Sequence, residues 1–189
     1  MGKYLENSEI IDWSHPEIVT KAGELAEGCK DAGEIAKNCF GFVRDRIRHS
    51  WDFKLNPVTC KASDVLKHGT GYCYAKSHLL AALLRANGIP AGLCYQRLAI
   101  NDGKYCLHGL NAVFLPEYGW YRIDARGNRT DIFAEFDPPR EVLPYPASRQ
   151  GEGMLTEIFD FPLEAVVKVL ESCSTYDMVS RNLPDVELP

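Results

Sequence analysis

The stretch from Gly69 to Leu80 constrains this chain most, because it passes from a glycine-rich turn directly into a segment with helical apolar spacing. This order places Cys73 in the first turn of a predicted helix. The first backbone N–H groups of a helix have no partner within it and form the positive end of its dipole, so they favour a thiolate over a thiol. The same groups can hold the oxyanion that forms when sulfur attacks a carbonyl. Cys73 is therefore a candidate nucleophile, although most free cysteines are simply small buried hydrophobic residues.

Size and charge restrict the class of protein. With 189 residues the chain is long enough for one complete hydrophobic core, which predicts a single domain over residues 1–189. The formal net charge of −5, without a run of Lys and Arg, argues against a nucleic-acid partner. Residues 1–12 lack the basic-then-apolar order of a signal peptide, and no apolar stretch approaches membrane-spanning length. The sequence therefore predicts a cytoplasmic protein that binds neither nucleic acid nor membrane, and it leaves the oligomeric state open.

The cysteines agree with that location. Seven of them are scattered from Cys29 to Cys173 without a repeated spacing, which does not predict a disulfide framework. Free thiols fit a reducing compartment, and a reactive cysteine needs one.

Helices are predicted for the first half of the chain. The segments Ser14–Glu17 and Asp31–Glu34 each place a glutamate three residues after a capping side chain. They predict one helix that ends near Gly28 and a second that ends near His49. The following elements are a loop over Trp51–Cys60, a short helix over Ala62–Lys67 and a central helix over Cys73–Ala86, whose buried stripe is Leu79, Leu80, Leu83 and Leu84.

After the central helix the apolar period changes from helical to alternating. Three strands are predicted, over Ala91–Ile100, Leu107–Leu115 and Trp120–Ala125, with turns at 101–103 and 116–119. Connections this short make the strands antiparallel neighbours.

The last third of the chain carries weaker signals. Prolines and charges over 126–153 predict irregular structure along one side of the site. A last helix is expected from Leu163 to about Cys173, with Asp160 as its start. Helices followed by an antiparallel sheet predict an α+β fold.

A cysteine nucleophile needs a base, and the base needs a partner that holds its tautomer. Four of the five histidines are poor candidates: His15 and His49 lie at helix ends, His68 precedes the glycine turn, and His78 lies roughly 140° around the helix from Cys73. His108 remains, early in the second strand, where its side chain can project across the sheet toward the helix that carries Cys73. Asp124 ends the third strand, and a short hairpin would bring it beside His108.

The order and local context of these residues resemble a known family. The segments Ala62–Leu66, Gly69–Cys73 and Leu83–Ala91 look like the region around the nucleophile of the transglutaminase-like superfamily. His108–Ala112 is similar to the histidine strand of that family, and Gly119–Ala125 to its aspartate strand.

The resemblance runs from about Val43 to Asn128, and it implies a core at about 43–128 with a C-terminal extension at about 129–189. The family often has an aromatic residue two places after the histidine, where this chain has Leu110.

The resemblance implies a papain-like core of a small, bacterial-type single-domain member, in which N-terminal helices and a central helix with the nucleophile pack against an antiparallel sheet. Cys73 matches the nucleophile, His108 the base and Asp124 the acid that orients it. The family usually has a second oxyanion donor upstream of the cysteine. Trp51, through its indole N–H, is the candidate here, and Gln96 and the region of Tyr72 compete with it.

The expected function is acyl transfer or hydrolysis at an amide through a thioester on Cys73, of amidase, protease or transglutaminase type. The substrate would be a peptide or a small amide, and no cofactor or metal is expected. Alternatives are an arylamine N-acetyltransferase-like enzyme, which would need a coenzyme A site, and a non-catalytic binding module. A zinc site is a further alternative, with Cys73, Cys94, Cys106 and His108 as ligands.

Overall fold

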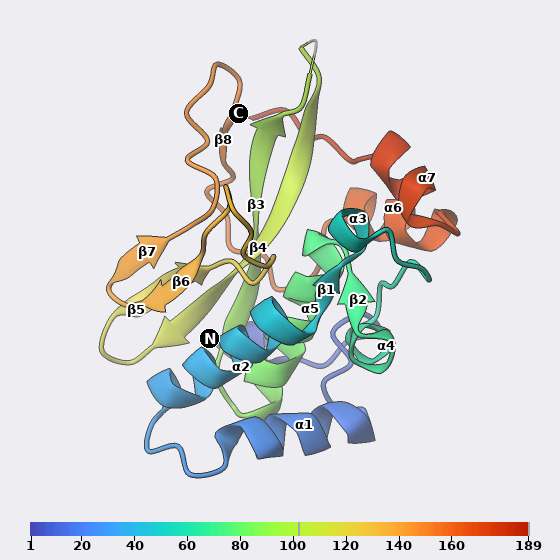
Figure 1. The fold of residues 1–189 in the computed structure, drawn as a ribbon. Helices are drawn as coiled ribbons and strands as arrows, with labels where there is room; N and C mark the ends of the chain where they lie inside the picture. Colours follow the sequence, from blue (N-terminus) through green and yellow to red (C-terminus); the bar gives the residue numbers. More distant parts are fainter. Residues whose placement is uncertain (102, 189) are drawn as a thin grey trace.

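Helix α5 (Cys73–Ala86) runs through the middle of the computed structural model, which describes residues 1–101 and 103–188 (Figure 1). Helices α1 (Pro16–Ala26), α2 (Ala32–Arg46) and α4 (Ala62–His68) pack around it, and the sheet packs against its other side. The predicted bounds of α5 are confirmed. More of α5 is buried than the predicted single stripe. Neighbouring elements on several sides leave every residue from Cys73 to Arg85 buried.

The predicted helix starts and ends are correct to within a few residues, with identifiable errors. The cap of α1 is His15 and not Ser14, since the His15 ring nitrogen accepts from the backbone N–H of Glu17. Asp31 caps α2 as predicted. Helix α2 ends at Arg46, before the expected His49, because the next residues leave the helix to form a strand pair.

That strand pair is short and parallel. Strand β1 (Arg48–His49) pairs with β2 (Thr70–Gly71), so His49 lies opposite Gly71, two residues before Cys73. The pair ties the chain that follows α2 to the turn that precedes the candidate nucleophile.

The three predicted antiparallel strands are confirmed. Strands β3 (Ala91–Ala99), β4 (Tyr105–Leu115) and β5 (Gly119–Ile123) are neighbours in the order β5-β4-β3. The predicted turn at 101–103 includes Asp102, which lies outside the described residues. The sequence did not predict a fourth strand, β8 (Gly153–Met154), which pairs with β3 on its other side.

The remaining elements are short. The segment predicted to be irregular contains a small hairpin, β6 (Glu135–Asp137) and β7 (Arg140–Val142), and the predicted loop after β1 contains the one-turn helix α3 (Ser50–Phe53). A 3₁₀ helix η1 (Gly2–Leu5) begins the chain, and α6 (Glu164–Ser172) and α7 (Tyr176–Arg181) lie near its end. Helix α6 starts after Leu163 and not at Asp160, and Thr175 caps α7.

The two faces of the sheet pack against different partners. Tyr95 and Leu107 belong to the main core around α5, whereas Leu110 belongs to a smaller cluster. Because strand side chains alternate, His108 shares the face of Leu110 and not that of Leu107. His108 still reaches Cys73 at the start of α5, as predicted. Near His108, β5 pairs with β4 only from Asn111 onward.

In the part of the chain that the structure describes, no helix is both long enough and apolar enough to cross a bilayer.

Candidate active site

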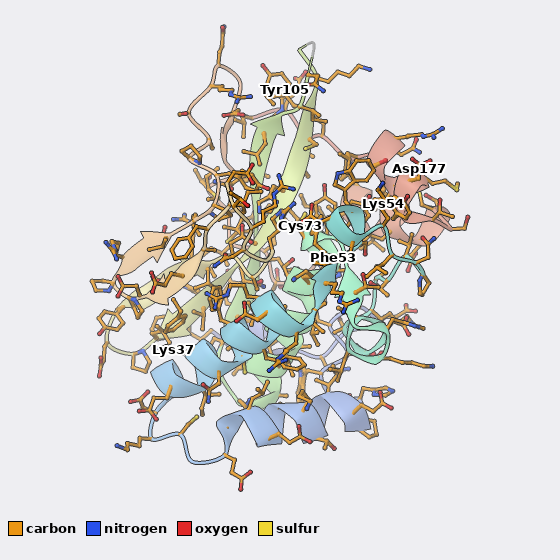
Figure 2. The ribbon with its side chains drawn as sticks, viewed as in Figure 1. Lys37, Phe53, Lys54, Cys73, Tyr105 and Asp177 are labelled. Atoms are coloured by element: carbon orange, nitrogen blue, oxygen red, sulfur yellow. The ribbon has the colours of Figure 1, made fainter. Side chains whose placement is uncertain are left out.

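Cys73 is the first residue of α5, and its side chain lies where this helix meets the sheet (Figure 2). The turn before it depends on glycine at two places. Gly69 has a φ of 64°, a left-handed conformation that ends α4. Gly71 is needed for space, because a Cβ there would lie 3.0 Å from the Cβ of Ala75. Its lack of a side chain allows β2 to pack closely on the first turn of α5.

Strand β4 touches the start of α5 directly. The backbone N–H of Gly109 donates to the Cys73 sulfur at 3.5 Å, and the Tyr74 hydroxyl donates to the carbonyl of Leu107 at 2.5 Å. A Cβ at Gly109 would lie 3.0 Å from the Tyr74 ring and 3.1 Å from its Cα. The glycine next to His108 therefore sets how closely the strand approaches the candidate nucleophile.

His108 is bonded to Asp124 as the sequence predicted. Its Nε2 lies 2.5 Å from Oδ2 of Asp124, and both side chains are buried. With Nε2 engaged by the carboxylate, Nδ1 is the ring nitrogen that is available to the Cys73 side chain. The β4–β5 register explains this placement, because Asn111 lies opposite Ile123 and Asp124 follows one place later.

The charges around His108 favour its protonated form. Burial of the ring lowers its pKa, but the charges of Asp124 and Cys73, together with hydrogen bonds to both side chains, raise the pKa to about 10. An imidazolium that faces the Cys73 side chain on one side and the Asp124 carboxylate on the other is the arrangement that this shift describes. The structure thus brings together the three side chains that were predicted to form the site.

Arg126 connects Asp124 to a second ion pair. Oδ1 of Asp124 accepts from the backbone N–H of Arg126 at 2.8 Å. The Arg126 guanidinium forms two contacts with Asp52 on α3, at 2.8 and 3.0 Å, and Arg129 also contacts Asp52 at 3.1 Å. Sequence analysis did not find this network, which links the end of β5 to the helix that carries Trp51.

Cys73 and His108 border a cleft of about 390 Å³. Its walls come from distant parts of the chain, and they include His49, Trp51, Leu98, Arg126, Tyr145 and Leu183. Arg126 and Tyr145 lie in the segment that was predicted to line one side of the site, and the structure confirms that expectation.

His49 was dismissed from sequence as a residue at a helix end, and the structure corrects this. Its ring lies against Tyr72, with 5.4 Å between ring centroids, and it borders the cleft. Burial and the positive charges of Arg126 and Lys76 lower its pKa well below the usual value, so it is neutral. Its Nδ1 lies 3.7 Å from Oδ2 of Asp52 and has no hydrogen-bond partner among the described residues.

The candidates for the second oxyanion donor are placed differently. Trp51 borders the cleft, and its ring centroid lies 6.0 Å from that of Tyr176 on α7. Gln96 is less suitable, because its amide N–H already donates to the carbonyl of Tyr145 at 3.0 Å. Tyr72 donates its hydroxyl to the carbonyl of Tyr176 at 2.6 Å. Trp51 thus remains the candidate, and its role stays a prediction.

His78 and Asn111 have structural contacts away from the reacting side chains. His78 is fully buried and bonds through Nδ1 to the carbonyl of Cys60, as expected from its position on α5. Asn111 donates to the carbonyls of Ser77 and Gly92, which fastens β4 to its neighbours. Within residues 1–101 and 103–188, no three His, Cys, Asp or Glu side chains are grouped as metal ligands, so the zinc alternative has no site there.

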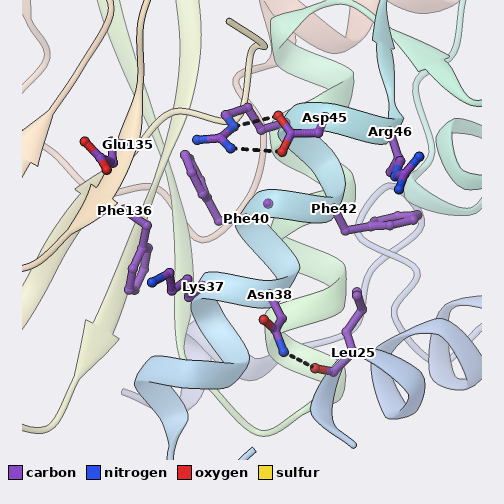
Figure 3. A pocket seen from close by; sticks show the side chains of 11 residues that line it. Leu25, Lys37, Asn38, Phe40, Phe42, Asp45, Arg46, Glu135 and Phe136 are labelled. Carbon is purple, nitrogen blue, oxygen red and sulfur yellow. Dashed lines mark hydrogen bonds and ion pairs between the residues drawn. The ribbon is translucent and has the colours of Figure 1, made fainter.

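A larger surface pocket of about 650 Å³ lies elsewhere, between α2 and β6 (Figure 3). Several of its polar groups bond to protein partners. Arg44 forms two hydrogen bonds to Asp45, at 2.7 and 2.9 Å, and the Asn38 amide donates to the carbonyl of Leu25 at 3.0 Å. The pocket shares no lining residue with the cleft at Cys73.

A family model described as the transglutaminase-like superfamily matches residues 19–125, which is more than half of the chain. The chain belongs to the transglutaminase-like superfamily. The match contains Cys73, His108 and Asp124, and it begins before Val43, where the resemblance was first visible. A comparison with curated protein sequences finds no match.

Solved structures support a transglutaminase-like fold. A proposed cysteine protease from Cytophaga hutchinsonii is similar with a TM-score of 0.52 and 17% identity, over 65% of this chain and 40% of that one. The periplasmic domain of TgpA from Pseudomonas aeruginosa, bound to ethylmercury, is similar with a TM-score of 0.50 and 20% identity, over 65% and 46%. The present chain thus corresponds to less than half the length of either. At these identities the likeness concerns the α+β fold, and the superfamily is one of cysteine-based catalysis.

Proposed function

We propose that this protein catalyses acyl transfer from an amide through a thioester on Cys73, with His108 as acid and base and Asp124 as the group that orients it. One observation carries the proposal. The His108 ring is held by Asp124 at 2.5 Å on one side and faces the Cys73 thiol on the other, at the N-terminus of α5. This is the geometry that nucleophilic catalysis by cysteine requires.

The first half-reaction releases the amine. The Cys73 thiolate attacks the carbonyl carbon, and the backbone N–H at the start of α5 stabilises the resulting oxyanion. The C–N bond then breaks, and the His108 imidazolium gives its proton to the departing nitrogen. This leaves a thioester on Cys73 and a neutral His108, hydrogen-bonded to Asp124.

The second half-reaction reverses these roles. His108 takes a proton from the acceptor, the acceptor oxygen or nitrogen attacks the thioester, and the sulfur leaves as a thiolate beside the imidazolium. With water as acceptor the product is a carboxylic acid, and with an amine it is a new amide. We propose hydrolysis of a peptide or a small amide in a reducing compartment such as the cytoplasm, where Cys73 stays reduced.

Selective alkylation tests whether the thiol is activated. Iodoacetamide at mildly acidic pH, followed by peptide mapping, should modify Cys73 ahead of the other cysteines. Burial raises the pKa of four other thiols to about 12, which leaves them protonated under these conditions; these are Cys39, Cys60, Cys94 and Cys106.

Two variants test whether the selective labelling of Cys73 depends on His108. His108→Gln should abolish the selectivity for Cys73, whereas His68→Gln, at the exposed last residue of α4, should preserve it. Modification spread evenly over the cysteines of the wild-type protein would contradict the proposal and favour a non-catalytic module.

Product analysis then separates the possible reactions. Small amides and glutaminyl peptides are incubated with the wild-type protein, with and without a primary amine, and released ammonia and the acyl product are measured. Hydrolysis predicts free acid in both cases, with ammonia released from a primary carboxamide and an amine from a peptide bond or substituted amide. An acyl product that contains the added amine would indicate a transferase instead, and acetylation of an arylamine by acetyl-coenzyme A would indicate the N-acetyltransferase alternative.

A further inference from the structure

Tyr145 enters the cleft from outside the part of the chain that matches the family. It lies between β7 and β8, twenty residues beyond the last matched position, Ala125. It nevertheless borders the same cleft as Cys73 and His108. The side chain thus comes from the C-terminal extension, which follows the part of the chain that matches the family.

The ring of Tyr145 packs directly on the candidate base. Its centroid lies 4.8 Å from that of the His108 ring, and the planes meet at 76°, which is an edge-on aromatic contact. Such a contact restricts rotation of the imidazole. It also contributes to the burial of His108, which is only 5% exposed.

The backbone of Tyr145 is anchored to the strand pair that carries His108. Gln96 on β3 lies opposite His108 on β4, and its amide N–H donates to the carbonyl of Tyr145 at 3.0 Å. Gln96 is itself buried, with 3% of its surface exposed. One strand pair therefore holds both the imidazole and the residue that packs on it, so their separation is fixed.

We propose that Tyr145 is a positioning residue that keeps the His108 ring in line between Cys73 and Asp124 and separates this ion pair from water. The inference rests on the proposed function of the site. Water near the pair would raise the local dielectric constant and weaken the attraction between imidazolium, thiolate and carboxylate. The raised pKa of His108 is consistent with a pair that is sheltered in this way.

Several titratable and charged groups surround His108 and bear on the test. They are Cys73 on α5, Asp124 after β5, His49 on β1, and Arg126 and Tyr145 in the loops that border the cleft. Only the contacts of Tyr145 are changed in the experiment, so a shift in the titration of His108 reports on the ring that was removed.

The test compares Tyr145→Phe, Tyr145→Leu and Tyr145→Ala with the wild-type chain. The leucine variant keeps much of the volume without the ring, which guards against a loss of folding in the alanine variant. Tyr118→Ala, at an exposed turn residue, is the matched control. The titration of His108 is followed by NMR of its imidazole, and the alkylation rate of Cys73 is measured at mildly acidic pH.

The phenylalanine variant should behave like the wild-type protein, because it keeps the edge-on contact. In the leucine and alanine variants the pKa of His108 should fall toward 6.5, and Cys73 should be alkylated about 10- to 100-fold more slowly. Gln96→Leu, which removes the anchor and keeps the ring, should give a smaller change in the same direction.

Failure of this inference and failure of the proposed function give different results. If the leucine variant folds and retains the wild-type titration of His108 and alkylation rate, Tyr145 is merely a wall of the cleft and the inference is overturned. If Cys73 of the wild-type protein is not selectively alkylated at all, the proposed function fails instead.

Discussion

Gly109 donates its backbone N–H to the sulfur of Cys73, and it lies so close to Tyr74 that a methyl group would contact the Tyr74 Cα at 3.1 Å. The separation between the base strand and the nucleophile helix is therefore set by the absence of a side chain. We expect Gly109→Ala to move β4 away from α5 and to lower the free energy of unfolding by about 1–3 kcal/mol, as overpacking does. The reactivity of Cys73 should fall with it.

Urea unfolding and alkylation kinetics measure these two effects. Gly23→Ala is the control, since it lies in α1 with open space around it and should be neutral or stabilising by up to about 1 kcal/mol. An unchanged stability and reactivity of Gly109→Ala would show that the strand has room to move.

The raised pKa of His108 predicts how stability depends on pH. The folded protein holds the imidazole proton up to about pH 10, whereas the unfolded chain releases it near 6.5. The stabilisation by His108 should therefore be complete below about pH 6.5 and be lost as the pH rises toward 10.

The difference between the wild-type protein and His108→Gln isolates this contribution. The comparison is needed because burial lowers the pKa of Lys76 to about 7. The contribution of Lys76 to stability therefore rises with pH over part of the same range, opposite to that of His108. Unfolding free energies from denaturant titrations at several pH values should converge for the two proteins as the pH approaches 10. Parallel curves from pH 6 to 10 would mean that His108 is not protonated in the folded state.

Trp51→Phe tests the candidate second oxyanion donor. The substitution keeps an aromatic ring near Tyr176 and removes only the indole N–H. If this N–H holds the oxyanion, kcat for amide hydrolysis should fall about 100-fold with little change in KM. Trp120→Phe, on β5 with its ring packed against Tyr4 and Phe114, is the control for loss of an indole outside the cleft. A kcat that does not respond would remove Trp51 from the mechanism.

The buried ion pair between Arg126 and Asp52 should contribute more to the unfolding free energy than an exposed ion pair does. Arg126→Met leaves Asp52 partly buried and with Arg129 as its remaining partner, and we expect a loss of about 1.5–3 kcal/mol in unfolding free energy. Arg140→Met removes the exposed pair with Asp137 and should cost less than about 1 kcal/mol. Equal effects of the two substitutions, measured by urea unfolding, would show that Asp52 is well solvated after all.

Local signals in the sequence predicted the central helix and the hairpin strands. Helix α5 begins at Cys73 and ends before Gly88, whose φ of 71° suits a residue just beyond a helix end. The residues 116–119 form a turn short enough to fix the β4–β5 register, so counting along the hairpin places Asp124 level with Leu110, two residues from His108 on the same face.

No such local signal in the sequence predicted the other residues that line the cleft. His49 enters it because two residues leave α2 and pair with Thr70 and Gly71, a parallel contact between segments about twenty residues apart. Tyr145 and Arg126 come from a stretch without periodicity, where position depends on individual hydrogen bonds such as those to Gln96 and Asp124. The face of β4 that carries His108 follows from alternation.

The order of the site along the chain has a consequence during synthesis. A ribosome releases Cys73 well before Asp124, and the cleft is completed only when residues as late as Leu183 have folded onto it. Until then the Cys73 thiol lacks part of the cleft that surrounds it. The reactivity proposed for Cys73 therefore arises only with the finished tertiary structure.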